Sequence, residues 1–336
     1  MTSNIAVIGC GTWGVSLGSL LAWKGYRVRG WDVNANLLCQ LDETRRHPKL
    51  PELDVPRSIE FSDDFAAVLQ GAEALVVVAP SVAMRQVITQ IKECPARAQN
   101  PFIIICSKGI EIETMMPMNE VAVDVLGPRF ANSVGVLSGP SHAEEVSRRM
   151  PTSVVAASQD PGVAPYIQQL FLTPEFRVYT QTDALGVELG GALKNVIAIA
   201  TGVCDGLGFG DNTRAALLTR GLAEMTRLGV AMGAQAATFS GLSGMGDLIV
   251  TATSQHSRNR KFGELLTRCS SVEEALEQVG MVVEGMPTAR AVARLAAKLG
   301  IETPIAAEVE QVIYHGKSPK EAVYDLMNRE AKAEIY

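Results

Sequence analysis

Short apolar runs alternate with amphipathic stretches through the first half of the chain. Short runs of largely apolar residues bounded by polar segments are typical of buried strands, and apolar side chains at helical spacing predict helices. Parallel strands need helical crossovers, so we expect βα units around a parallel sheet. The expected strands cover residues 5–8, 27–31, 75–79, 102–106, 134–137 and 154–157, and the clearest helices cover 13–24 and 82–92.

The pattern changes after about Tyr179, where strand signals fade and helical spacing continues toward the C-terminus. Helices are expected at residues 185–201, 214–232, 258–267, 272–279, 288–299, 305–314 and 319–327. The chain is also longer than one compact domain usually is. We therefore predict an α/β domain over residues 1–182 and an all-α domain over residues 183–336, with a ligand site in the cleft between them.

A glycine-rich turn follows the first expected strand. Gly9, Gly11 and Gly14 form a GxGxxG pattern that opens a helix, which is the context in which this pattern binds a dinucleotide. The glycines let the backbone approach a pyrophosphate, and the helix N-terminus attracts its charge. The pattern predicts a Rossmann-type domain that binds NAD or NADP, although a tight strand-to-helix turn alone would also explain it.

Asp32 bears on the choice between these cofactors. It ends the second expected strand, 18 residues after Gly14. An acidic side chain there can bond an adenosine ribose hydroxyl and would repel a 2′-phosphate, which favours NAD over NADP. The alternative is that Asp32 caps the next helix. Arg45 and Arg46 keep NADP open.

Two lysines stand where a charge is costly. Lys108 follows the apolar run 102–106, at the carboxyl end of an expected strand, where open α/β sheets bind ligands. Lys194 is the sole charged residue between Glu188 and Asp205, and burial there would lower its pKa toward a range useful for proton transfer. The alternatives are a solvated loop lysine for Lys108 and, for Lys194, a buried stem with its ammonium in water.

Further polar residues stand near glycines and helix starts. Asp247 follows the glycine-rich segment 241–246, which we expect to be a flexible turn that presents the carboxylate; the alternative is an N-cap. Residues 257–261 (SRNRK) begin a helix and fit either a phosphate pocket or a solvated charged face. Ser141 and Glu144 match a capping box, which by itself has a structural meaning.

Composition argues against several classes of function. Lys and Arg number 30 against 36 Asp and Glu, so the net charge of −6 provides no basic surface for nucleic acid or an anionic membrane. Six scattered cysteines and four histidines show no ligand spacing, so we expect no metal, no disulfide framework and a reducing cytoplasm. Residues 1–22 are uncharged, but they lack a basic n-region and are interrupted by glycines, which argues against secretion or membrane insertion.

Six motifs extend the picture beyond the nucleotide pattern: 9–14 (GCGTWG), 107–109 (SKG), 137–141 (LSGPS), 191–195 (GALKN), 244–248 (GMGDL) and 257–259 (SRN). In order and spacing they resemble bacterial-type NAD(P)-dependent glycerol-3-phosphate dehydrogenase. The resemblance covers nearly the whole chain. The chain departs from the family at residues 31–34, where the basic residue suited to a 2′-phosphate is absent.

The resemblance implies reversible reduction of dihydroxyacetone phosphate to sn-glycerol 3-phosphate, for glycerophospholipid synthesis. It implies that Lys194 donates or accepts the proton, that Lys108 polarises the carbonyl and that Asp247 supports both lysines. With the glycine loop and Asp32 included, the expected cofactor residues are Gly9, Gly11, Thr12, Trp13, Gly14, Asp32, Lys108, Ala143, Arg258, Val282 and Glu284. The expected substrate residues are Lys108, Gly139, Ser141, Lys194, Asp247, Ser257, Arg258 and Asn259.

Two alternatives stay open from the sequence. A β-hydroxyacid or 6-phosphogluconate type dehydrogenase has a similar lysine helix, but the motifs 257–259 and 246–247 favour the glycerol phosphate enzyme. A catalytically silent NAD-sensing protein would share the nucleotide domain, but it would not need Lys108, Lys194 and Asp247. We also expect a homodimer in the cytoplasm, with dihydroxyacetone phosphate or sn-glycerol 3-phosphate as its partner molecule.

Overall fold

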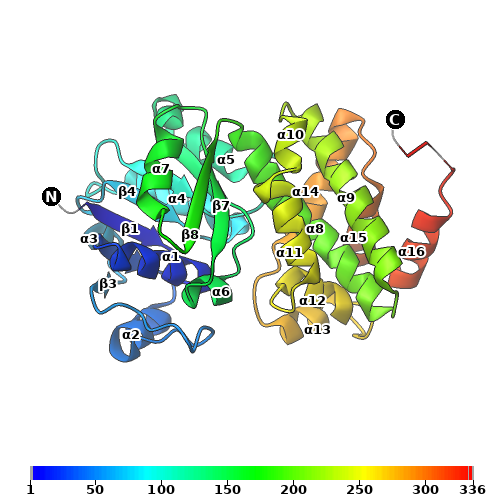
Figure 1. Cartoon of the computed structure of the whole chain (residues 1–336), viewed down its shortest axis with the longest axis horizontal. Helices are drawn as coiled ribbons and strands as arrows, with labels where there is room; N and C mark the ends of the chain where they lie inside the picture. Colours follow the sequence, from blue (N-terminus) through cyan, green and yellow to red (C-terminus); the bar gives the residue numbers. More distant parts are fainter. Residues whose placement is uncertain (1–2, 332, 335–336) are drawn as a thin grey trace.

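The computed structural model describes residues 3–331 and 333–334 and shows two halves, a sheet flanked by helices and a helical bundle (Figure 1). The strands are β1 (Asn4–Ile8), β2 (Arg27–Trp31), β3 (Ile59–Phe61), β4 (Ala74–Val77), β5 (Phe102–Ile105), β6 (Val134–Ser138), β7 (Thr152–Ala157) and β8 (Phe176–Gln181). They form one sheet in the order β3-β2-β1-β4-β5-β6-β7-β8. All six expected strands are present, and the predicted fold class is confirmed.

The sheet differs from the prediction at its edges. The strands β3 and β8 were not expected, because β3 has only three residues and β8 mixes buried and exposed positions. The sheet is also not wholly parallel, since β7 runs antiparallel to β6 and parallel to β8. Between β6 and β7 the chain has only the five-residue helix α6 (Ala143–Ser147). Such a helix rises about 8 Å, too little to carry the chain back along a strand of about 17 Å.

Both faces of the sheet are buried, as a mostly parallel sheet requires. Alternate residues of β1 show this, because Ile5 and Val7 belong to one hydrophobic cluster and Ala6 and Ile8 to another. The helices of this half are α1 (Thr12–Trp23), α2 (Ala35–Thr44), α3 (Phe65–Leu69), α4 (Met84–Glu93), α5 (Met118–Leu126), α6 and α7 (Val163–Phe171), with 3-10 turns at Ser81–Ala83 and Pro128–Ser133.

The second half is helical, as predicted. Its helices are α8 (Ala184–Gly206), α9 (Asp211–Ala231), α10 (Ala236–Phe239), α11 (Asp247–Thr253), α12 (Arg258–Leu265), α13 (Val272–Val279), α14 (Gly285–Leu299), α15 (Pro304–His315) and α16 (Pro319–Met327). Helix α8 is long and apolar enough to span a membrane by composition, but 94% of its apolar window is buried inside the protein. It is the core helix of this half: α9 to α12, α14 and α15 pack against it, while α13 packs on α12 and α16 on α15.

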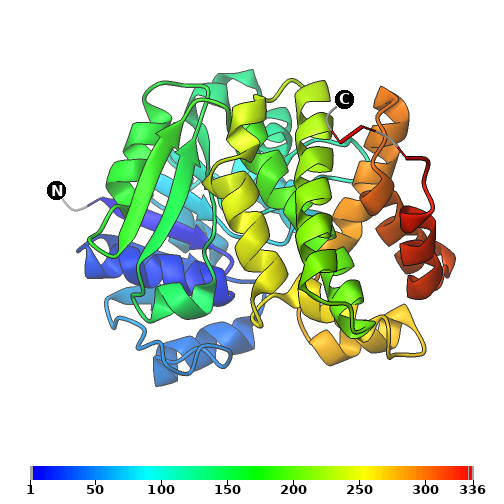
Figure 2. The same cartoon turned by 45° about the vertical axis from the view of Figure 1, so that its right-hand side comes forward.

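The segment before α11 corrects one expectation. Residues Leu242–Gly246 form a π-helical turn packed against α8 and β7, not a flexible loop. Figure 2 shows the helices before and after this turn, in yellow, beside the green strands of the sheet. A Cβ on Gly244 would lie 2.1 Å from the carbonyl oxygen of Phe239, and one on Gly190 would lie 2.7 Å from that of Ser243. These glycines therefore permit close backbone packing and do not supply flexibility.

The two halves share part of a core. Ile110, which follows β5 by five residues, is 1% exposed and belongs to the hydrophobic cluster of the helical half. Ile112 and Met115 pack against the same cluster. Lys108 is therefore held from both sides, by the strand before it and by the buried Ile110 after it.

Candidate active site

The glycine loop at the carboxyl end of β1 has the shape that a pyrophosphate requires. Gly9 has φ of 101°, and a Cβ there would lie 2.7 Å from the Val78 carbonyl oxygen. A Cβ on Gly14 would lie 1.8 Å from the Gly9 oxygen, whereas one on Gly11 would meet nothing within 4 Å. The loop is thus closed on its inner side and open at Gly11, where α1 begins without a side-chain cap. The free amides of a helix N-terminus suit an anionic group.

Asp32 is held beside this loop. Its carboxylate accepts hydrogen bonds from the backbone N–H of Cys10 at 2.7 Å and from that of Asn34 at 2.9 Å. The N-cap of α2 is Asn34, whose side chain accepts from Leu37 N–H at 3.1 Å. The capping alternative for Asp32 is therefore wrong, and each of its carboxylate oxygens keeps a lone pair for a further donor.

Arg45 and Arg46, which left binding of the NADP 2′-phosphate possible, form hydrogen bonds with other groups of the protein. Arg45 donates to the Ile59 carbonyl at 2.8 Å and to Asp42 at 2.6 Å. Arg46 donates to the Pro51 carbonyl at 2.8 Å. Recruiting either guanidinium to a phosphate would break these bonds.

The centre of the site is a buried carboxylate between two ammonium groups. Asp247 accepts from Lys108 at 2.6 Å on one oxygen and from Lys194 at 2.7 Å on the other. Lys108 also donates to the Gly139 carbonyl at 3.0 Å, and Lys194 to the Thr251 hydroxyl at 2.5 Å. Asp247 is 1% exposed and Lys194 6%. The solvated alternatives for Lys108 and Lys194 are wrong, because both ammonium groups are paired with Asp247. The capping alternative for Asp247 is wrong as well, because the N-cap of α11 is Gly246.

The pKa values of Lys194 and Asp247 are both lower than usual, for different reasons. Burial lowers the pKa of Lys194 to about 8, and Lys108 and Arg258 add to the effect while Asp247 opposes it. Burial alone would raise the pKa of Asp247, but the ammonium groups of Lys108 and Lys194 outweigh it and lower that pKa. At neutral pH the cluster therefore holds a carboxylate and a lysine whose proton is easily lost.

Thr251 is a member of the cluster that the sequence analysis missed. It stands four residues after Asp247, one helical turn along α11, and it is 3% exposed. The i, i+4 spacing would have indicated it, had α11 been predicted. Gly191 lies beside the cluster, because a Cβ there would meet the Lys108 side chain at an ordinary contact distance of 3.5 Å and would clash with the Ser138 hydroxyl at 2.7 Å.

Most donors of the segment 257–261 are already used. Ser257 caps α12 and accepts from Arg260 N–H at 3.2 Å. The Arg260 guanidinium bonds Asp205 at 2.6 Å, and Lys261 donates to the Gln278 carbonyl at 2.9 Å. The cluster of cations expected from the sequence is thus divided, and only part of it faces the site.

Arg258 is the cation of this segment that stays available. Among the described residues, none forms a hydrogen bond or ion pair with its guanidinium, and its charge acts on Lys194 and Glu284. Its neighbour Asn259 donates to Asn195 at 2.9 Å and accepts from Gly285 N–H at 2.9 Å, leaving one amide hydrogen free. Arg258 and this N–H of Asn259 are therefore the donors of the two residues that are left for an anion.

Three further expected residues, Gly139, Ser141 and Ala143, follow the end of β6. Gly139 contributes its carbonyl to Lys108, and Ser141 donates back to that carbonyl at 2.9 Å. The capping box expected for Ser141 is wrong, because α6 has His142 as its N-cap. Ala143 is buried at the start of α6, where its carbonyl faces Ser16 of α1 at 3.4 Å.

Glu284 reaches the sheet half from the helical half, and Val282 lies two residues before it. Val282 is 47% exposed. The Glu284 carboxylate accepts from the backbone N–H of Ser81 at 3.2 Å and from its hydroxyl. Burial raises the pKa of Glu284, although the bonds from Ser81 oppose that shift. Direct contacts thus join Lys108, Lys194, Asp247 and Gly139, whereas Asp32 and the glycine loop form a separate cluster along the same sheet edge.

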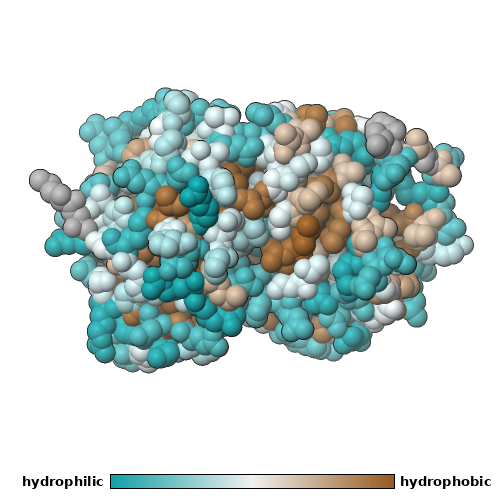
Figure 3. Space-filling view, viewed as in Figure 1, coloured by the Kyte–Doolittle hydropathy of each residue, from teal (hydrophilic) through white to brown (hydrophobic). Residues whose placement is uncertain are grey.

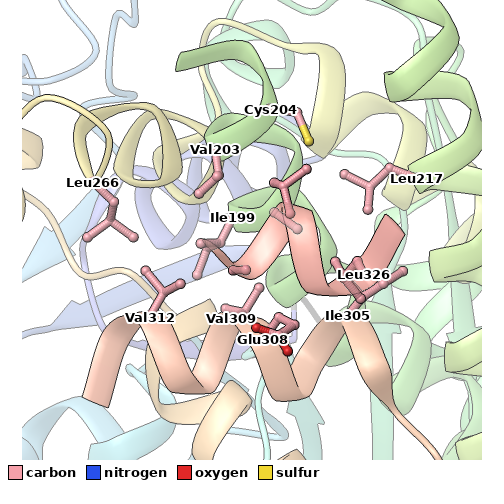
Figure 4. Close-up of a pocket in the computed structure, with 13 residues that line it drawn as sticks. Ile199, Val203, Cys204, Leu217, Leu266, Ile305, Glu308, Val309, Val312 and Leu326 are labelled. Atoms are coloured by element: carbon pink, nitrogen blue, oxygen red, sulfur yellow. The ribbon is translucent and has the colours of Figure 1, made fainter. Parts of the chain in front are cut away.

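A cavity in the helical half is a different feature. It lies among α8, α15 and α16, and Figure 4 shows its lining of apolar side chains with Glu308 as the charged exception. It contains none of the residues of the lysine cluster. An apolar lining offers nothing to a phosphate or a ribose, so this cavity is not the candidate site.

Comparison with known proteins gives one consistent result. Models of the NAD-dependent glycerol-3-phosphate dehydrogenase N-terminus and C-terminus match residues 4–164 and 183–324. The chain is 49% identical over 335 residues to glycerol-3-phosphate dehydrogenase (NAD(P)+) of Geobacter sulfurreducens, covering 99% of each, and 48% identical over 336 residues to that of Moorella thermoacetica, covering 100% of this chain and 98% of the relative. The crystal structure of glycerol-3-phosphate dehydrogenase from Coxiella burnetii superimposes with a TM-score of 0.92 at 36% identity, covering 98% of this chain and 99% of that one.

Proposed function

The chain belongs to the NAD-dependent glycerol-3-phosphate dehydrogenase family, and on that premise we propose that Lys194 is the acid–base residue that interconverts dihydroxyacetone phosphate and sn-glycerol 3-phosphate. The chain is an oxidoreductase that acts on a CH–OH group with NAD or NADP. The silent NAD sensor is therefore not supported, nor is a β-hydroxyacid-type enzyme. The observation that carries the proposal is the shared carboxylate of Asp247 between Lys194 and Lys108.

In the direction of reduction, negative charge develops on the carbonyl oxygen. Lys194 gives a proton to that oxygen, and a pKa of about 8 makes the transfer easy near neutral pH. Lys108 stabilises the developing charge, and Asp247 orients both ammonium groups. In the opposite direction neutral Lys194 accepts the proton of the hydroxyl. Thr251 bonds the Lys194 nitrogen and positions it.

The glycine loop and Asp32 fit a dinucleotide. The opening at Gly11 would take the pyrophosphate against Thr12 and Trp13, and Asp32 would take the ribose. We propose that Ala143, Val282 and Glu284 complete the cofactor wall, and that Gly139, Ser141, Ser257 and Asn259 join the lysines around the substrate. When bound, the nicotinamide supplies or receives the hydride.

The charge at Asp32 leads to a prediction about cofactor preference. Oxidation of NADH and of NADPH by the purified protein, followed at 340 nm with dihydroxyacetone phosphate, should give a kcat/KM roughly 10- to 100-fold higher for NADH, because the Asp32 carboxylate would repel a 2′-phosphate. Asp32→Asn keeps the shape and an acceptor and should bring the two values closer, chiefly by improving NADPH. Equal use of both cofactors by the unaltered enzyme would contradict the role of Asp32, and no substrate-dependent oxidation with either would overturn the proposed function.

The free guanidinium of Arg258 leads to a second prediction. Arg258→Ala should raise the KM for dihydroxyacetone phosphate roughly 10- to 100-fold, the loss expected for one hydrogen bond between charged groups. The KM for NADH should change much less. The matched control is Arg260→Ala, which removes a cation of the same helix that is already bonded to Asp205. A larger rise in the substrate KM for Arg260→Ala than for Arg258→Ala would exchange the two roles.

We further propose that the enzyme lies in the cytoplasm and supplies glycerophospholipid synthesis, and that its two domains cover residues 1–182 and 183–336. We also propose that it is a homodimer. The support for a dimer is exposed apolar surface on the helical half, visible where α9 and α11 lie in Figure 3. Val230 of α9 is 47% exposed and Ile249 of α11 is 48% exposed. A second copy of the chain would bury such a surface.

A further inference from the structure

The segment between α13 and α14, residues 280–284, is tied to the nucleotide half at both of its ends, and we name it the strap. At its first end, Lys49 donates to the Gly280 carbonyl at 2.9 Å. At its last end, the Glu284 carboxylate accepts from the N–H and the hydroxyl of Ser81. Both anchors belong to the sheet half, whereas the strap belongs to the helical half.

The order of the strands places the strap across the glycine loop. Lys49 lies in the segment between α2 and β3, on the β2 side, and Ser81 lies four residues beyond the end of β4. The segment of Lys49 is near the carboxyl end of β2, because the charge of Asp32, which follows β2, acts on the pKa of His47. In the sheet, β1 stands between β2 and β4. Two strand spacings amount to about 10 Å, and four residue steps reach about 13 Å. A strap tied on both sides therefore passes over the carboxyl end of β1, where the glycine loop 9–14 begins.

The two anchors are unequal. Ser81 is 4% exposed and makes two hydrogen bonds to Glu284. Lys49 is exposed and makes one bond to Gly280. Water competes for an exposed bond and not for a buried pair, so the Lys49 end opens first and the Ser81 end acts as the pivot.

We propose that Lys49 is a latch that controls the exchange of the dinucleotide. This role rests on the proposed function, because it takes the glycine loop to be the cofactor site. With the latch closed, the strap lies over the pyrophosphate position and holds the cofactor down. Breaking the bond between Lys49 and Gly280 detaches the strap from the sheet half on the β2 side, while Gly280 stays the C-cap of α13 and Val283 stays buried in the helical half. This local opening lets the cofactor enter and leave. Lys49 is thus a positioning residue that acts through the strap.

The test measures NADH association and dissociation rates by stopped-flow fluorescence for the wild-type protein, Lys49→Met and Lys92→Met. The control is closely matched, because Lys92 is also exposed and donates to one backbone carbonyl, that of Val125 at 2.7 Å, but within the sheet half. Lys49→Met should release NADH roughly two- to tenfold faster, the change expected for one exposed hydrogen bond, without slower association. Lys92→Met should keep the wild-type rates.

A second measurement does not depend on the cofactor. Without NADH, amide hydrogen exchange in residues 281–283 should be faster in Lys49→Met than in the wild-type protein and unchanged in Lys92→Met. Unchanged exchange and unchanged NADH rates in Lys49→Met, with normal NADH binding by the wild-type protein, would overturn the latch alone. Failure of the wild-type protein to bind NADH would overturn the proposed function, and the cofactor role of the latch with it.

Discussion

Lys194→Met is expected to lower kcat for reduction of dihydroxyacetone phosphate roughly 10²- to 10⁴-fold, the range typical for loss of a general acid. Methionine keeps the apolar stem in the core of α8 but cannot donate a proton. The affinity for NADH, measured by fluorescence titration, should change little, because the lysine bonds Asp247 and Thr251 and touches none of the expected nucleotide residues. Equal losses in turnover and in cofactor affinity would count against an acid–base role.

The pH dependence of kcat tests the same role of Lys194, and its direction follows from the pKa of the lysine. Burial lowers the pKa of Lys194 to about 8. Reduction needs the ammonium form, which is present below that value, so kcat for reduction should fall as the pH rises through about 8. Oxidation of sn-glycerol 3-phosphate needs the neutral amine, so its kcat should rise through the same range. Both limbs should vanish in Lys194→Met; their persistence would assign the titration to another group.

Asp247→Asn should have the second largest effect. Asn keeps the size but removes the charge that Lys108 and Lys194 share. Because Asp247 raises the pKa of Lys194, its loss should lower that pKa further, and less of the lysine should carry a proton at pH 7.5. We expect kcat/KM for reduction to fall roughly 100-fold or more at this pH and to recover in part at lower pH.

The same substitution should also lower stability. The buried ammonium of Lys194 and the half-buried one of Lys108 would lose their partner, and breaking a buried pair typically costs about 3–5 kcal/mol. Thermal or urea unfolding measures this loss. The control is Asp124→Asn, which removes a partner of Arg85 in an exposed ion pair and should cost less than about 1 kcal/mol. An Asp247→Asn protein with normal stability and a normal pH profile would show that the three side chains do not act as a unit.

Local patterns along the chain determined the architecture. Apolar runs separated by helical spacing predicted six of the strands, since burial on both faces of a sheet leaves a direct trace in composition. The glycine loop was recognisable for a similar reason, because its geometry arises within six consecutive residues. The edge strand β8 left a weaker trace, as one of its faces is in water.

What tertiary structure alone decided is which partner each charged group meets. Lys194 and Asp247 were notable one by one, but they lie 53 positions apart and join only when α11 packs on α8. Arg258 and Arg260 look alike in the sequence, and one of them is taken by Asp205 from the end of α8. The segment 241–246 looked flexible because its glycines were read without the neighbours that they accommodate. Local propensity acts over a few residues, whereas the pairing of buried charges depends on which distant elements enclose them, and that is settled by packing.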